Sequence, residues 1–141
     1  MNNNFLKFHE IKNNSILYIN KNEIAIIDTD DSVFPDRNVS RIYFMESTDV
    51  SSFCVNETVE KIFINCNLDN FIRLHNYPTN NPILVNIDGI SILDSETSNG
   101  NSNTKIFLRN STNVKSFLVY ESPDKIVKLI ETLQNGIKTT E

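Results

Sequence analysis

The fold is decided by residues 5–30, FLKFHEIKNNSILYINKNEIAIIDTD, and by residues 71–96, FIRLHNYPTNNPILVNIDGISILDSE, which repeat the same pattern. The two stretches align without a gap at an offset of 66, and seven of the 26 positions are identical. The identical pairs are Phe5/Phe71, His9/His75, Asn14/Asn80, Asn20/Asn86, Ile24/Ile90, Ile26/Ile92 and Asp28/Asp94. Self-similarity of this extent predicts a structural unit that occurs twice in the chain.

A second pair of stretches continues the repeat toward the C-terminus. Residues 41–63 align with residues 105–127 at an offset of 64, and ten of these 23 positions are identical. The offset changes between the aligned blocks, in segments rich in Asn and Ser that also hold Pro35 and Gly100. A loop at this place would tolerate a deletion, so the sequence predicts a tandem duplication.

Both copies predict the same series of short strands, because apolar residues alternate with polar ones or run between turn residues. The expected strands are residues 5–11, 16–19, 23–27, 41–45 and 52–55 in the first copy, and residues 71–77, 83–85, 89–93, 105–109 and 116–120 in the second. Polar turns at residues 47–49 and 111–113 are expected to lead into the last strand of each copy.

An amphipathic helix is predicted at the end of each copy. Thr58 and Ser122 stand at equivalent positions as N-caps, and Pro123 suits the first helical position. Gly136 is a natural stop for the second helix. Apolar residues at helical spacing mark one face, namely Val59, Ile62, Phe63 and Cys66 in the first helix and Ile126, Val127, Ile130 and Leu133 in the second.

These elements predict an α+β protein of two tandem repeats, each a small antiparallel sheet of four to five strands followed by one amphipathic helix. The first repeat covers residues 1–68, the second covers residues 69–136, and residues 137–141 form a tail. A unit of roughly 65 residues is marginally stable alone, so we expect the repeats to pack together. The simplest expectation is a pseudo-twofold pair that resembles a homodimer.

Composition and charge narrow the class of protein. With 141 residues, 39% of them hydrophobic and 22% charged, the chain has the size of one ordinary domain or two very small ones. The net charge of −5 argues against nucleic acid as a partner. No signal-peptide pattern and no bilayer-spanning apolar stretch are present, so we expect a soluble cytoplasmic protein without a membrane partner. Cys54 and Cys66 are expected to be small buried apolar side chains.

The motifs inside each copy resemble the FlbD-like family, small proteins from bacterial flagellar operons with relatives in phages. The resemblance is best in the second copy, at Phe71 to His75, Val85-Asn86, Ile90 to Ile92, Lys105 to Leu108, and Val119 to Ser122 before the helix. It implies a regulatory or accessory binding role and no chemistry. We therefore expect a non-catalytic binding or regulatory module, built as a fused pseudo-dimer, whose partner is a protein (self or other) or a small ligand.

Residues 42–130 also resemble the LytTR DNA-binding domain. The matching residues are Phe71, Arg73 and His75, followed by Val85, Asn86 and Ile90. Pro78 to Pro82 lengthen the intervening segment, and few basic residues lie nearby. A third alternative is a phage accessory protein that sequesters a ligand or blocks a host protein, which is suggested by the occurrence of similar small proteins in phages.

The sharpest catalytic suggestion is the apolar strand that ends in Asp28-Thr29-Asp30, which resembles the first motif of haloacid-dehalogenase-type phosphotransferases. The equivalent Asp94-Ser95-Glu96 instead suggests a strand that leaves the sheet into an acidic loop. An EF-hand loop does not fit, because Val33 and Val39 stand where it needs glycine and glutamate. No nucleotide-binding, zinc-protease or nucleophile-elbow motif is present, so we expect no enzyme activity, no cofactor and no metal site.

The candidate site residues are polar side chains found at the same place in both copies. They are His9, His75, Asn20, Asn86, Glu57 and Glu121. A pseudo-twofold would bring the histidines together near Asp28 and Asp94 as a metal or anion site, whereas the structural alternative is a bond to a neighbouring turn. The asparagines are expected to close a hairpin and the glutamates to bond backbone or a basic neighbour, or either pair to line a pocket at the contact between the copies.

Overall fold

The computed structural model describes residues 4–30, 39–45, 49–98, 101–109 and 114–139. Within these residues the chain folds into two α-helices and three antiparallel sheets, which confirms the predicted α+β class. Neither described helix combines the length and the apolar character that crossing a bilayer requires.

The two halves of the chain contain the same elements in the same order. In the first half (residues 4–68) these are β1 (Phe5–His9), β2 (Ile16–Asn20), the 3₁₀ turn η1 (Lys21–Glu23), β3 (Ile24–Asp30), β4 (Val39–Phe44), β5 (Ser52–Val55) and α1 (Val59–Asn65). In the second half (residues 69–139) they are β6 (Phe71–His75), β7 (Pro82–Asn86), η2 (Ile87–Gly89), β8 (Ile90–Ser98), β9 (Asn101–Leu108), β10 (Ser116–Val119) and α2 (Pro123–Thr139).

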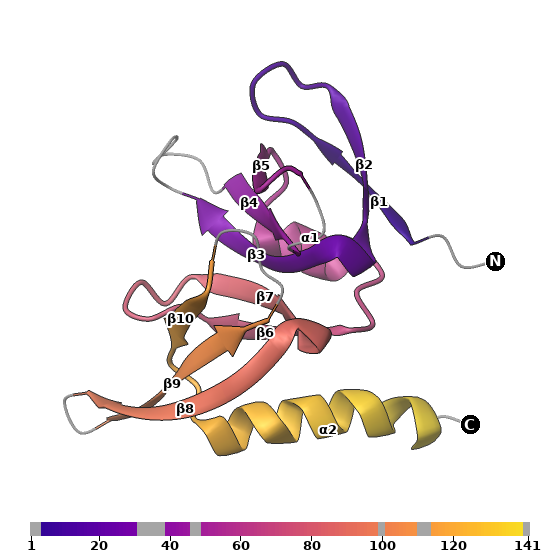
Figure 1. Cartoon of the computed structure of the whole chain (residues 1–141). Coiled ribbons are helices and arrows are strands. Elements are labelled where there is room, and N and C mark those ends of the chain that lie inside the picture. Colours follow the sequence, from indigo (N-terminus) through magenta and orange to yellow (C-terminus); the bar gives the residue numbers. More distant parts are fainter. Residues whose placement is uncertain (1–3, 31–38, 46–48, 99–100, 110–113, 140–141) are drawn as a thin grey trace.

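A five-stranded sheet in the order β5-β4-β3-β7-β6 joins the halves (Figure 1). Its central contact pairs β3 of the first half with β7 of the second, and Ile26, Ile27 and Asp28 lie opposite residues 85, 84 and 83. We call the seam this β3–β7 contact together with the side chains of α1 and of the β6–β7 hairpin that pack beside it. The remaining strands form a two-stranded sheet, β1-β2, and a three-stranded sheet, β10-β9-β8.

Within each half, the opening hairpin is tied to the last strand by matching hydrogen bonds. The N–H of Asn56 donates to the carbonyl of His9, and the N–H of Tyr120 donates to the carbonyl of His75, both at 2.9 Å. An isolated bridge connects each opening strand region to β5 or β10 at the same place. Each half therefore curls its hairpin back over its three-stranded meander.

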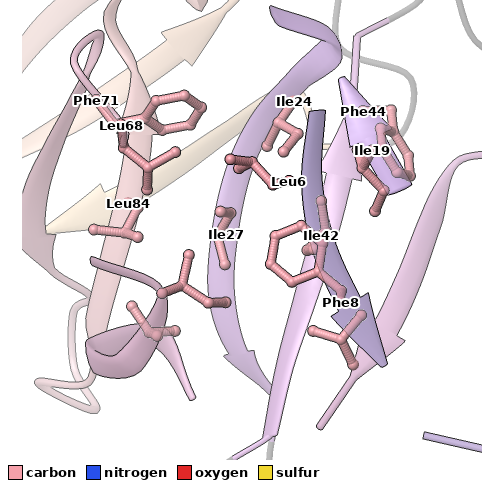
Figure 2. Close-up of a cluster of buried hydrophobic side chains, with 13 residues drawn as sticks. Leu6, Phe8, Ile19, Ile24, Ile27, Ile42, Phe44, Leu68, Phe71 and Leu84 are labelled. Carbon is pink, nitrogen blue, oxygen red and sulfur yellow. The ribbon is translucent and has the colours of Figure 1, made fainter. Parts of the chain in front are cut away.

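Each half has its own apolar core, and each core is completed by side chains from the other half. Alternation along β1 turns Leu6 and Phe8 inward. The same first core contains Phe71 and Leu84 from β6 and β7, which lie beside the β3 side chains in Figure 2. Conversely, Ile26 of β3 belongs to the second core. The seam is thus a packed apolar contact and not only a row of backbone hydrogen bonds.

The expected pseudo-twofold packing is not confirmed, because the seam joins strands that are not equivalent. By the sequence alignment, β3 corresponds to β8, and β7 corresponds to β2. A twofold arrangement that pairs β3 with β7 would also pair β8 with β2. In the part of the chain that the structure describes, β2 pairs only with β1 and β8 only with β9. The halves meet head to tail, with β2 and β8 toward opposite ends of the molecule (Figure 1).

The helix ends differ from the prediction. The stop expected at Gly136 is wrong, since α2 continues to Thr139 and includes part of the predicted tail. Glycine ends a helix when it takes the left-handed conformation, and nothing forces that conformation here. The first helix ends at Asn65, and Cys66 is its C-cap with extended backbone and not a member of its apolar face.

Strands β8 and β9 extend further than the sequence predicts. Their paired region continues to Ser98 and Asn101, well beyond the apolar residues that mark the strands in the sequence. The added residues are Asp, Glu, Ser, Thr and Asn, which give no alternation of apolar and polar side chains. The turns expected at 47–49 and 111–113 lie, apart from Asp49, outside the described residues.

Asn14 and Asn80 occupy equivalent places in the β1–β2 and β6–β7 turns, with φ of 56° and 63°. Asparagine tolerates this left-handed backbone, whereas a β-branched residue does not. We expect Asn80→Val to lower the free energy of unfolding by about 1–2 kcal/mol, and Asn80→Gly to be neutral or slightly stabilising. Denaturant titration of both variants checks this expectation, and a valine variant as stable as the wild type would contradict it.

Candidate functional site

The candidate histidines and glutamates form two matching pairs, one in each half. Nδ1 of His9 lies 2.7 Å from Oε2 of Glu57, and Nδ1 of His75 lies 2.7 Å from Oε2 of Glu121. The other carboxylate oxygen accepts the backbone N–H of the same histidine, at 3.1 Å for Glu57 and 3.0 Å for Glu121. An ionised carboxylate only accepts, so a hydrogen bond between the two side chains in that form requires the proton on Nδ1 of the ring. The structure does not bring the two histidines together with each other.

The backbone carbonyl of each glutamate also accepts a hydrogen bond. The hydroxyl of Ser40 donates to the carbonyl of Glu57 at 2.7 Å, and the hydroxyl of Thr104 donates to that of Glu121 at 2.6 Å. Each glutamate directly precedes a helix N-cap. The glutamate therefore connects the end of the opening strand, the second strand of the meander and the start of the helix. The carboxylate and the carbonyl of each glutamate together act as a structural tie between these three elements.

The candidate asparagines hold the turns before β3 and β8. Oδ1 of Asn20 accepts the N–H of Asn22, and Oδ1 of Asn86 accepts the N–H of Asp88, both at 3.0 Å. These are Asx turns that cap η1 and η2, not hairpin closures, since β2 and β3 are not paired with each other. In the buried Asn86, Nδ2 also donates to the carbonyl of Ile24 across the seam at 3.0 Å.

The aspartates of the Asp-x-Asp segment make contacts inside the sheet. Oδ2 of Asp30 accepts from Nε of Arg41 at 2.6 Å, and the Asp30 side chain is almost fully buried. Asp28 accepts from the backbone N–H of Thr29 at 2.8 Å and from Nδ2 of Asn76 at 3.1 Å. Residues 31–38, which would complete an EF-hand loop, lie outside the described residues. Across the described ranges, no three His, Cys, Asp or Glu side chains are grouped as metal ligands.

The residues that resemble the LytTR motif are engaged in internal contacts. Phe71 is buried in the first core, and Asn86 is buried at the seam. Arg73 makes a two-pronged ion pair with Glu60 of α1, with both N···O distances at 2.7 Å. This hydrogen bonding lowers the pKa of Glu60 and raises the pKa of Arg73. The pair joins α1 of the first half to β6 of the second, so it is a polar part of the contact between the halves.

The cysteines have ordinary thiol environments. Cys54 is buried and Cys66 is partly buried, and neither forms a disulfide. Burial raises the pKa of the Cys66 thiol. Both positions fit the predicted role of small apolar side chains, with Cys66 packed against the first core.

Sequence reasoning missed the most distinctive surface feature, which lies on the open edges of β2 and β8. Residues that the seam buries have exposed counterparts at the same place in the other half. The paired exposed fractions are 2% for Ile26 and 55% for Ile92, 0% for Leu84 and 64% for Tyr18, and 3% for Phe71 and 52% for Phe5. The alignment of the two halves identified these equivalent residues, but it did not indicate which residue of each pair is buried.

Open grooves lie around the first half. A groove of about 380 Å³ is lined by Phe5, Lys7, Lys61 and neighbours from β1 and α1. A second groove of about 370 Å³ lies beside β5 and is lined by Glu10, Arg41 and Phe53 among others. The first groove includes the exposed Phe5 of β1 in its lining.

Comparison of the chain with protein-family models, with curated proteins and with solved structures gave no match in any of the three.

Proposed function

We propose that the protein is a non-catalytic binding module made of two FlbD-like units joined head to tail, and that it binds protein through the open edges of its sheets. Duplication of one unit is supported by the shared order of elements and by the contacts repeated at equivalent positions. The repeated contacts include the His–Glu pairs, the Asx turns and the asparagines with positive φ.

The observation that carries the binding proposal is the set of exposed apolar side chains on the edge strands. Tyr18 on β2 and Ile92 on β8 are more than half exposed, and both edges lack a second partner strand within the described residues. An unprotected edge with apolar side chains is a template for strand pairing with another chain. Strand addition of this kind supplies backbone hydrogen bonds for affinity and side-chain pockets for specificity.

A non-catalytic role is supported by how the candidate residues are used. The glutamates Glu57 and Glu121 tie three elements together, and Asp30 pairs with Arg41 inside the sheet. These are the contacts of side chains that position the backbone. A regulatory or accessory role then follows from what binds at the two edges and not from chemistry at the His–Glu pairs.

A comparison of the wild type with the double variant Tyr18→Arg/Ile92→Arg tests the proposed function. Capture experiments first select candidate partner proteins, and a second copy of the chain is included among them. Each purified candidate is then titrated against both forms by calorimetry. We expect at least one protein to bind the wild type and to lose at least about tenfold in affinity for the double variant. Equal binding by both forms for every protein, or binding of DNA at low salt by both forms, would contradict the proposal.

A further inference from the structure

The seam provides a template for a second contact of the same kind. It pairs β3 with β7 antiparallel, with Ile26 opposite Val85 and Ile27 opposite Leu84. By the alignment, the counterpart of β3 is β8 and the counterpart of β7 is β2. Those two strands are the open edges at opposite ends of the molecule (Figure 1). A head-to-tail contact between two copies of a unit always leaves one unused surface of each type.

We propose that β8 of one chain pairs with β2 of a second copy, antiparallel and in the register of the seam. This register sets Ile92 opposite Ile19, Leu93 opposite Tyr18, and Asp94 opposite Leu17. The inference rests on the proposed function and names the protein partner as the chain itself.

Apolar burial gives the first argument for a second copy as the occupant. Ile92 and Tyr18 are exposed at the open edges and Phe5 is exposed on the adjoining β1, whereas the counterparts of all three in the other half are among the most buried side chains. In the proposed contact, Ile92 enters the first core of the second copy, as Ile26 enters the second core within one chain. Phe5 and Tyr18 pack against the neighbour as Phe71 and Leu84 do at the seam.

Polar groups give the second argument. Asn86 Nδ2 donates across the seam to the Ile24 carbonyl, and Asn20 holds the same Asx turn, with its own Nδ2 available for the Ile90 carbonyl of a neighbour. The seam ion pair of Glu60 with Arg73 has the counterparts Asp124 and Lys7, which also carry opposite charges. These two polar contacts between the halves therefore have counterparts of the same kind at the open edges.

One counterpart pair is unfavourable and limits the affinity. At the seam, Asn76 donates to Asp28 at 3.1 Å. The counterparts are Glu10 and Asp94, two carboxylates that would face each other in the contact between copies. The contact between copies is therefore weaker than the seam and depends on concentration. Glu10→Asn restores the donor found in the second half and is expected to strengthen association.

Two single-edge variants test the proposal by mixing. Tyr18→Arg blocks the β2 edge and leaves β8 open, whereas Ile92→Arg blocks β8 and leaves β2 open. Sedimentation velocity should give the mass of one chain, 16.2 kDa, for each variant alone and of two chains for the equimolar mixture. The wild type should form larger assemblies as concentration rises, and Glu10→Asn should do so at about tenfold or more lower concentration. Ile64→Arg, at an exposed site on α1, should behave as the wild type.

The outcomes separate this inference from the proposed function. A monomeric wild type whose edges bind a different protein overturns the inference and leaves the proposed function intact. Assembly of either single-edge variant alone, at the strength of the wild type, overturns the head-to-tail pairing because it shows contact between like edges. A mixture that remains monomeric overturns it as well. If the edge variants change neither self-association nor the binding of any other protein, both the proposed function and this inference are wrong.

Discussion

Replacing Ile26 by alanine is expected to lower the free energy of unfolding by about 2–4 kcal/mol, whereas the same change at Ile92 costs about 1 kcal/mol or less. The two isoleucines occupy equivalent positions in the alignment and in their strands. They differ because Ile26 is buried in the core of the other half, while Ile92 is exposed at an open edge. The difference in stability therefore measures what the seam contributes at this position.

Urea unfolding in dilute solution measures both variants. Dilution matters because association through β8 would add burial at Ile92. The matched pair controls for helix and strand propensity, since both changes are isoleucine to alanine in a strand next to a register shift. Equal losses at the two positions would contradict the packing of Ile26 across the seam.

Glu121→Ala is expected to lower the free energy of unfolding by about 2–4 kcal/mol, and Glu57→Ala by about 1–2 kcal/mol. Both changes remove acceptors for the ring and the backbone N–H of a histidine. The cost is larger at Glu121 because this side chain is more deeply buried, with 6% of its surface exposed against 24% for Glu57. Water replaces the lost acceptor more easily at Glu57.

Chemical denaturation of both variants, with Glu121→Gln as a third, checks the prediction. Glutamine keeps an acceptor oxygen for the N–H of His75 and should fall between Glu121→Ala and the wild type. A Glu121→Ala variant within about 0.5 kcal/mol of the wild type would contradict the role of this carboxylate as a structural tie.

The local elements could be predicted from the sequence because the repeated sequence pattern gives two versions of each element. The N-caps at Thr58 and Ser122 accept the N–H groups of Lys61 and Lys125, as the capping pattern predicts. The strands appear where apolar residues alternate. The Ser and Thr residues that extend β8 carry no such signal, and their pairing follows from the hairpin that continues beyond the apolar segment.

The contact between the halves could not be predicted, because it depends on which strand edges remain after each half has folded. Local periodicity gives the face that a side chain occupies and not the strand that lies beside it. Leu84 and Tyr18 are equivalent large side chains in the alignment, yet Leu84 is buried and Tyr18 is exposed. The same reason explains why a twofold packing was the natural expectation and why the seam instead joins β3 to β7.

The sequence identified which candidate polar residues occupy equivalent positions in the two halves. It did not identify the side chains that each of them contacts. His9 and Glu57 are 48 positions apart in the chain, and the pairing appears only once the opening hairpin has closed on the last strand. Equivalent positions in a repeated sequence pattern indicate a shared role without showing whether the residue is a structural tie or a binding group. Geometry supplies that distinction here, since each carboxylate accepts from both the ring and the backbone of its histidine.

Residue-level amide hydrogen exchange at two protein concentrations tests the head-to-tail seam and its open counterparts most directly. In dilute solution, amides of residues 26–28 and 83–85 that face the seam should exchange more slowly than those at the equivalent positions 92–94 and 17–19. On concentration, the amides of residues 92–94 and 17–19 should become protected. Equal, fast exchange at both sets in dilute solution, or no gain of protection on concentration, would contradict the seam and its repetition between copies.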